Sequence, residues 1–179
     1  VGIQQSGATN PSSLGEYSRN LVVFFKDSSQ VWSVDPDPSK MSFVQSLDVG
    51  CPYPHGAANM AGDVFFASYD GIRSITTLTT TGSLIDVDVG SPIDTLLKPE
   101  LSVSADVRAF YFRGGGQYWL MKGSEAWVYS FSRTSKISAW SHYEFPFSIT
   151  DVTELDGDLY FRAGDTVYKL DDSARCQGR

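Results

Sequence analysis

Two cysteines and two histidines are the side chains of this sequence best suited to act as nucleophiles, bases or metal ligands. Cys51 and Cys176 lie far apart in the chain, and neither belongs to a Cys-x-x-Cys or Cys/His spacing that would hold a metal. His55 and His142 are equally isolated. We therefore expect two free thiols, and two histidines that lie in turns or pack at a surface rather than bind a metal.

Acidic side chains recur in two short stretches that could be imagined as calcium ligands, although neither has the spacing of an EF-hand loop. We interpret Asp35-Pro36-Asp37-Pro38 as a turn, because Asp-Pro pairs initiate turns. Asp86 and Asp88 would share one face of a strand, which we expect to be the solvated face. Neither histidine has a visible orienting partner for nucleophilic catalysis. The sequence predicts no enzyme activity and no catalytic, metal-binding or cofactor-binding residue.

Charge and composition argue against two further classes of protein, nucleic-acid binders and proteins with a membrane-spanning helix. The chain has 179 residues, 14 basic and 21 acidic, and the resulting charge of −7 comes without a basic run, so the electrostatic footprint of a nucleic-acid binder is missing. The longest apolar run, Leu21 to Phe25, is far shorter than the roughly 20 residues of a membrane-spanning helix. Because the sequence starts without Met or a signal-like segment, we expect a processed or excised piece.

Four β-hairpins explain how the remaining residues are arranged. Each consists of two short stretches rich in aromatic and β-branched residues, bounded by turn residues. The four pairs are 21–25 with 31–35, 64–66 with 72–75, 117–121 with 126–129, and 159–161 with 167–171. The second stretches are spaced by 41, 54 and 41 residues. The longer interval predicts an inserted loop at 91–106, and we expect at most one short helix in the chain, near Ile93 to Leu97.

Smaller signals support the hairpins. Leu47-Asp48-Val49-Gly50 recurs as Val87-Asp88-Val89-Gly90, which indicates a further repeated element. Asp70-Gly71 and Asp156-Gly157 are typical of two-residue type I′ turns, which need positive φ at both central positions. The three glycines 114–116 predict a loop between two strands.

Aromatic residues are abundant, with nine Tyr, eleven Phe and four Trp. They could form a stacking platform for sugars or bases. We favour packing between sheets, because Phe25, Phe66, Trp119 and Phe161 occupy similar positions in their hairpins.

A unit of about 41 residues matches one blade of a β-propeller, for which roughly 40–50 residues are usual. The sequence therefore predicts an all-β fold, with residues 1–179 forming one β-propeller domain or propeller fragment of four repeats. Both a closed four-bladed ring and an arc of a larger propeller remain open, and a barrel or sandwich is the competing fold. By alignment of the repeat, Val1 to Ser6 would be the outer strand of a blade.

Three stretches resemble a family of phage proteins: Gly50-Cys51-Pro52 leading into 62–74, the segment from Trp127 to Tyr143, and 158–162. They are similar to the tail nozzle (tubular tail) proteins and packaged-DNA stabilisation proteins of short-tailed phages. This resemblance implies a non-enzymatic structural virion protein of the tail or head-to-tail connector, assembled in the host cytoplasm. Copies would form a ring around the DNA exit channel and contact portal or adaptor proteins, with DNA passing nearby without tight binding.

Two other functions remain open. One is a carbohydrate- or protein-binding β-propeller module, which a concave patch of exposed Trp and Tyr at one rim would favour. The other is a glycosidase, which would need paired carboxylates about 5–9 Å apart.

Overall fold

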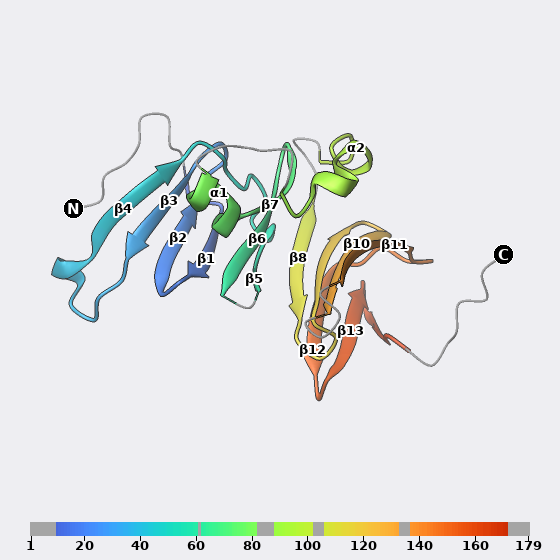
Figure 1. Ribbon diagram of the computed structural model, residues 1–179. Helices are drawn as coiled ribbons and strands as arrows, with labels where there is room; N and C mark the ends of the chain where they lie inside the picture. Colours follow the sequence, from blue (N-terminus) through green and yellow to red (C-terminus); the bar gives the residue numbers. More distant parts are fainter. Residues whose placement is uncertain (1–9, 61, 82–87, 102–105, 133–136, 172–179) are drawn as a thin grey trace.

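The computed structural model describes residues 10–60, 62–81, 88–101, 106–132 and 137–171. It shows an all-β protein with four antiparallel sheets that follow one another in chain order (Figure 1). The predicted outer strand at Val1 to Ser6, as well as Asp86 and Cys176, lies outside the described residues. No helix in the described ranges is long and apolar enough to cross a membrane.

The first sheet contains β1 (Ser13–Tyr17), β2 (Asn20–Phe24), β3 (Ser29–Ser33) and β4 (Ser42–Leu47), each paired with the next. A short 3-10 helix, η1 (Pro38–Lys40), precedes β4. The Asp37 side chain caps η1 by accepting a hydrogen bond from the Ser39 amide at 3.0 Å, and Asp35 accepts one from the Asp37 amide at 2.9 Å. The interpretation of this Asp-Pro stretch as a turn is thus confirmed.

The second sheet contains β5 (Ala57–Met60), β6 (Asp63–Ser68) and β7 (Gly71–Ser74), followed by helix α1 (Ile75–Thr81). Helices η2 (Ser91–Ile93) and α2 (Asp94–Leu97) then lead to the third sheet, which contains β8 (Val107–Phe112), β9 (Gln117–Lys122), β10 (Glu125–Ser132) and β11 (Ile137–Glu144). The fourth sheet contains β12 (Asp151–Leu155), β13 (Asp158–Ala163) and β14 (Thr166–Lys169).

All four predicted hairpins are formed. They are β2–β3, β6–β7, β9–β10 and β13–β14, the second and third strands of each sheet. The predicted loop at 114–116 joins β8 to β9. The helix near Ile93 to Leu97 is also confirmed as α2.

The expectation of a single short helix was wrong, because α1 follows β7 directly. Its sequence, Ile-Thr-Thr-Leu-Thr-Thr-Thr, is poor in strong helix formers, since β-branched residues lose side-chain freedom in a helix. Burial of Ile75 and Leu78 offsets this low propensity. The Ser74 hydroxyl also accepts a hydrogen bond from the Thr77 amide at 3.2 Å, as a cap at the start of the helix.

The turn predictions are half correct. Asp156 and Gly157 have φ values of 53° and 83°, as a type I′ turn requires. At the other site, Ser68 pairs with Gly71, so the turn residues are Tyr69 and Asp70 and neither has positive φ. Gly71, which begins β7 directly after that turn, has a φ of 115°.

The first strands of the sheets lie next to one another. Contacts join β1 to β5, β5 to β8 and β8 to β12. The Ala109 amide in β8 donates to the His55 carbonyl before β5, at 2.7 Å. The remaining strands of each sheet continue outward from this row, and the first and fourth sheets lie at its two ends (Figure 1).

Large aromatic side chains pack between successive sheets. Phe24 and Phe66 join the first and second sheets with ring centroids 4.8 Å apart, and Phe65 and Tyr118 join the second and third at 5.4 Å. Trp119 and Phe161 join the third and fourth at 5.6 Å. The predicted packing roles of Phe66, Trp119 and Phe161 are confirmed. In the first sheet Phe24 makes this contact, whereas the predicted Phe25 is buried just beyond the end of β2.

Candidate functional site: an aromatic pocket beside a buried ion pair

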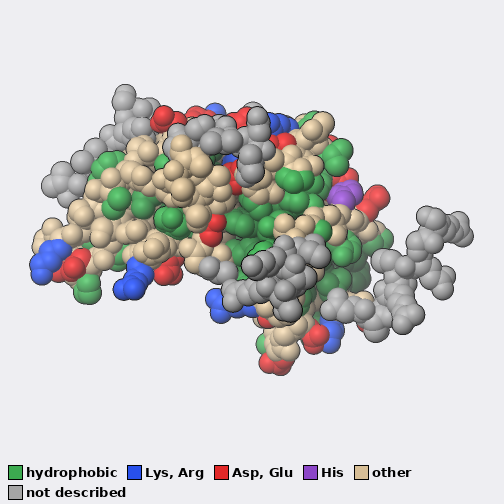
Figure 2. All heavy atoms as spheres, in the orientation of Figure 1, with side chains coloured by type: hydrophobic (Ala, Val, Ile, Leu, Met, Phe, Trp, Pro, Cys, Tyr) green, Lys and Arg blue, Asp and Glu red, His purple; other side chains and the backbone are tan. Residues whose placement is uncertain are grey.

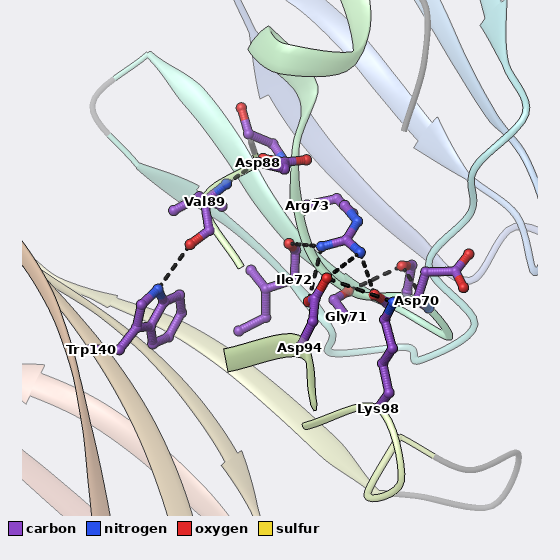
Figure 3. A network of polar contacts seen from close by, with 11 residues as sticks. Asp70, Gly71, Ile72, Arg73, Asp88, Val89, Asp94, Lys98 and Trp140 are labelled. Atoms are coloured by element: carbon purple, nitrogen blue, oxygen red, sulfur yellow. Dashed lines mark hydrogen bonds and ion pairs between the residues drawn. The ribbon is translucent and has the colours of Figure 1, made fainter. Parts of the chain in front are cut away.

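A buried ion pair joins the second sheet to the segment inserted before the third (Figure 3). The Asp94 carboxylate at the start of α2 accepts hydrogen bonds from both terminal nitrogens of Arg73 in β7, at 3.1 and 2.8 Å. Only 7% of the Arg73 side chain and 17% of the Asp94 side chain are exposed. Arg73 also donates to the carbonyls of Ile72 and Asp70. The guanidinium is thus held by one carboxylate and two backbone carbonyls.

Asp88 forms the second part of this network. Its carboxylate accepts hydrogen bonds from the Val89 amide at 2.6 Å and the Ser74 amide at 3.3 Å. The side chain is buried, so the expectation that it faces solvent was wrong. Burial raises the pKa of Asp88, and the two backbone hydrogen bonds and the nearby Arg73 oppose that rise. Asp88 fixes the backbone at Val89 against the beginning of α1.

Trp140 in β11 completes the connection between the second and third sheets. Its indole nitrogen donates to the Val89 carbonyl at 2.8 Å (Figure 3). The Trp140 ring also lies 5.2 Å from the ring of Tyr129 on the paired strand β10. These contacts fix the orientation of the indole, so that the residues around it form a preshaped surface.

A pocket of about 490 Å³ opens beside this tryptophan. It is lined by side chains from the insertion and from the two outer strands of the third sheet: Asp88, Val89, Pro92, Ile93, Tyr129, Ser138, Ala139 and Trp140. We call it the Trp140 pocket. Two aromatic rings, apolar carbons and a few polar groups are what a small organic ligand with one apolar face and several hydroxyl groups requires.

A second pocket, of about 540 Å³, lies along the row of first strands and is lined by residues of β5, β8, β12 and the turns beside them. Its principal carboxylate, Glu154, accepts hydrogen bonds from the Arg113 amide at 2.9 Å and the Gly114 amide at 3.2 Å. Glu154 therefore supports the turn between β8 and β9. The Trp140 pocket is lined in addition by an indole whose orientation is fixed by a hydrogen bond, and we therefore regard it as the stronger candidate.

The two histidines lie at different places. His142 in β11 packs its ring 5.2 Å from Trp127, and its Nε2 lies 3.9 Å from Glu125 Oε2. His55 lies before β5, where its carbonyl accepts the bond from Ala109 described above. His142 is thus packed at the surface, as predicted.

Cys51 is a free, buried thiol between the first and second sheets. Burial raises its pKa to about 12, and its sulfur donates to the Tyr53 carbonyl at 3.4 Å. A thiol in this state is a packing group rather than a nucleophile. Within the described ranges, no three His, Cys, Asp or Glu side chains are placed to hold a metal ion.

The Trp140 pocket has no counterpart among the sequence predictions, in which the aromatic residues pack between sheets and Asp88 faces solvent. One signal was available: Trp140 is a large apolar residue in Ser-Ala-Trp-Ser-His, where small and polar residues surround it. The hydrogen bond from Trp140 to Val89 spans 51 positions, and no local pattern could reveal it.

No protein-family model matches the chain, and no curated protein matches it. Among solved structures it is similar to Kluyveromyces lactis Hsv2, with 12% identity and a TM-score of 0.43 over 93% of this chain and 48% of that one. It is also similar to the hemopexin fold protein CP4 from cow pea, with 14% identity and a TM-score of 0.38 over 90% of this chain and 86% of that one. The chain thus spans about half the length of the Hsv2 structure. At these scores neither likeness bears on function.

Proposed function

We propose that the four sheets are successive blades of a β-propeller and that the described chain is an arc of it. Two features support this arrangement. Each sheet runs outward from its first strand without a crossover, and the first strands of neighbouring sheets are in contact. In Figure 1 the first and fourth sheets stand at opposite ends of the row.

On this scaffold the chain is a non-enzymatic binding module whose ligand site is the Trp140 pocket. The observation that supports this most directly is the fixed indole of Trp140, which Val89 orients beside the ring of Tyr129. A pocket of about 490 Å³ lies within the range of roughly 300–1,000 Å³ typical of small-molecule sites.

A neutral carbohydrate is the ligand class that fits best. The C–H groups on one face of a sugar ring can pack on an aromatic ring, while its hydroxyls bond to groups such as Ser138 at the pocket wall. The net charge of −7 disfavours nucleotides and other anionic ligands.

The test is a screen of neutral mono- and disaccharides by quenching of tryptophan fluorescence, followed by calorimetry on the sugars that bind. Trp140→Ala removes the stacking surface, and Ser138→Arg fills the pocket from an exposed position. Both variants should reduce affinity at least tenfold. Trp32→Phe, in the first sheet, is the matched control and should bind as the wild type does. The proposal fails if no sugar binds, or if both pocket variants bind normally.

A structural virion role is the second candidate, which the resemblance to phage tail proteins suggests. The observation that favours it is the presence of exposed apolar side chains on the sheets at both ends of the row, including Leu14 at 61% and Val167 at 65%. Here the chain would belong to a ring around the DNA exit channel in the virion, beside portal or adaptor proteins. Its acidic charge would limit the grip on passing DNA.

This role predicts weak DNA binding and ring-shaped particles. In a gel-shift assay near physiological salt, we expect dissociation constants no tighter than the ~10⁻⁴ to 10⁻⁶ M of non-specific binders. Electron microscopy of the purified protein should show rings. Nanomolar binding to duplex DNA, or particles no larger than one chain at every concentration, would contradict it.

A further inference from the structure

The third sheet turns one face toward the second sheet, and the Trp140 pocket lies on that face. Tyr129 of β10 and Tyr118 of β9 belong to it, since their rings lie 5.8 and 5.4 Å from the ring of Phe65 in β6. Trp140 pairs with Tyr129 across β10 and β11, so its side chain shares the face. The pocket is therefore part of a continuous sheet surface that extends beyond the residues that line it.

The exposure of aromatic side chains increases along β10 on this face. Trp127, Tyr129 and Phe131 all point to it, because the pairing of β10 with β11 is regular from Glu125 to Ser132 and alternate residues share a face. Trp127 is 5% exposed, Tyr129 is partly buried and Phe131 is 42% exposed. The face is thus covered at one end of the strand and open at the other, where Phe131 lies.

Phe131 borders the Trp140 pocket. It pairs with Ser138 in β11, which lines the pocket. It is also the diagonal neighbour of Trp140, because Trp140 pairs with Tyr129, two positions before Phe131. Diagonal neighbours on paired strands are about 7–8 Å apart. Phe131 itself does not line the pocket, so its ring adjoins the opening rather than the interior.

The charged side chains that the third sheet contributes to this face lie at its other end. They are Lys122, Glu125 and Glu144, which the register places in one row across β9, β10 and β11. In the pocket lining, Asp88 is the only charged residue, and its carboxylate already accepts two backbone hydrogen bonds. A neutral ligand can therefore extend from the pocket over Phe131 without burying a charge of the third sheet.

We propose that Phe131 forms a second sugar subsite beside the Trp140 pocket, so that the ligand is a chain of at least two linked neutral sugars. The inference rests on the proposed function of the pocket and names its ligand more closely. One sugar ring packs on Trp140 and the next on Phe131, each through the C–H groups of one face. The separation of the two side chains suits two rings joined by a glycosidic bond better than a single ring.

An exposed phenylalanine alone would indicate little, because apolar atoms make up much of any protein surface. Phe131 differs from such a residue in its position. It continues a row of aromatic side chains that includes Tyr129 and the fixed indole of Trp140. Contact between copies of this chain is the competing role for Phe131, and the experiment separates the two.

Calorimetry on the full chain tests the subsite with neutral sugars of increasing length. The probes are α- and β-linked gluco-, manno- and galacto-oligosaccharides of one, two and three sugars. Phe131→Ala removes the subsite, and Phe131→Trp replaces one aromatic ring by another. Phe43→Ala is the matched control, because Phe43 in β4 of the first sheet is also an exposed phenylalanine, at 37%. Circular dichroism verifies that each variant is folded.

In the wild type, a disaccharide should bind about tenfold more tightly than the monosaccharide of the same series, which is the gain expected of one further aromatic contact. Phe131→Ala should cancel that gain and leave the affinity for the monosaccharide unchanged. Phe131→Trp and Phe43→Ala should keep the gain. Trp140→Ala should weaken the binding of every sugar.

A disaccharide that binds no more tightly than its monosaccharide, or a gain that Phe131→Ala leaves intact, would overturn the subsite while the Trp140 pocket keeps its proposed function. Sedimentation equilibrium of the wild type and Phe131→Ala tests the competing role. If the substitution weakens self-association and leaves all sugar affinities unchanged, Phe131 belongs to a contact between copies and the subsite is refuted. If no sugar binds, the proposed function fails and the subsite fails with it.

Discussion

Arg73 and Asp94 form a two-point ion pair that connects β7 to α2 across 21 positions of the chain, and nearly all of the Arg73 side chain is buried in it. The pair holds the inserted segment against the second sheet (Figure 3). Val89, the residue that orients Trp140, directly precedes that segment in the chain. Neither residue of the ion pair lines the candidate pocket, but the pair stabilises the part of the chain that does.

Asp94→Ala should destabilise the protein by about 3 kcal/mol, because it leaves the buried Arg73 guanidinium without its carboxylate. Lys98→Ala is the control: Lys98 Nζ lies 3.7 Å from the same carboxylate but its side chain is 47% exposed, so the loss should be below about 1 kcal/mol. Urea denaturation of both variants measures the free energy of unfolding. If both variants lose the same free energy of unfolding, the buried Arg73 guanidinium does not account for the effect of Asp94→Ala.

Asp88 should make stability depend on pH. Its folded-state pKa is raised above the ordinary value of 3.8, so the folded protein binds the proton more tightly than the unfolded chain does. The contribution of this group is most favourable below pH 3.8 and is lost as the pH rises through the folded-state pKa. Asp88→Asn should remove this component.

The measurement is the urea midpoint of the wild type and Asp88→Asn from pH 4 to 7. The difference between the two curves should change in favour of the variant as the pH rises. Asp106→Asn, at a side chain 78% exposed, controls for the loss of one negative charge. A constant offset between wild type and Asp88→Asn would refute the assignment.

Local sequence patterns predicted the hairpins, because alternating β-branched and aromatic residues between turn residues determine strand pairing over a few positions. They did not predict α1, whose threonines disfavour a helix until Ile75 and Leu78 are buried. Local sequence patterns also could not predict the candidate pocket. The pocket depends on a contact between Val89 and Trp140, which are far apart in the chain, and no local spacing encodes that contact.

Charged side chains lie mainly along the upper and lower margins of the molecule in Figure 2, with hydrophobic and uncharged residues between them. The overall charge of −7 argued against a nucleic-acid binder but did not indicate this distribution of charges. The sequence likewise did not indicate that Asp88 is buried, because its neighbours in the sequence are typical of a solvated strand.

Ser74 and Thr80 test how α1 is stabilised. Ser74→Ala removes the cap on the Thr77 amide and the 2.6 Å hydrogen bond to Asp63, and should cost about 1–2 kcal/mol. Thr80 is exposed, and its hydroxyl bonds back to the Thr76 carbonyl at 2.7 Å. Thr80→Ala should stabilise by a few tenths of a kcal/mol, because Ala is the better helix former. Thermal unfolding of the two variants should therefore shift in opposite directions, and a loss for both would contradict this account of the helix.

The turn between β1 and β2 offers a stabilising substitution. Ser18 and Arg19 both have positive φ, 48° and 63°, although neither is glycine or asparagine. Tyr17 pairs with Asn20 across this two-residue turn, so its geometry is that of a type I′ hairpin, for which Asn-Gly is the preferred sequence. Ser18→Asn combined with Arg19→Gly should raise the free energy of unfolding by about 1 kcal/mol through relief of backbone strain.

Gly157→Ala in the β12–β13 turn is the opposite control. Gly157 has a φ of 83° and open space around its α-carbon, so an added methyl group meets no neighbour and only the backbone conformation penalises it. We expect a loss of about 1 kcal/mol there. Urea denaturation should place the double variant above the wild type and Gly157→Ala below it. If the double variant is destabilised instead, the Ser18 and Arg19 side chains must make contacts that outweigh their backbone strain.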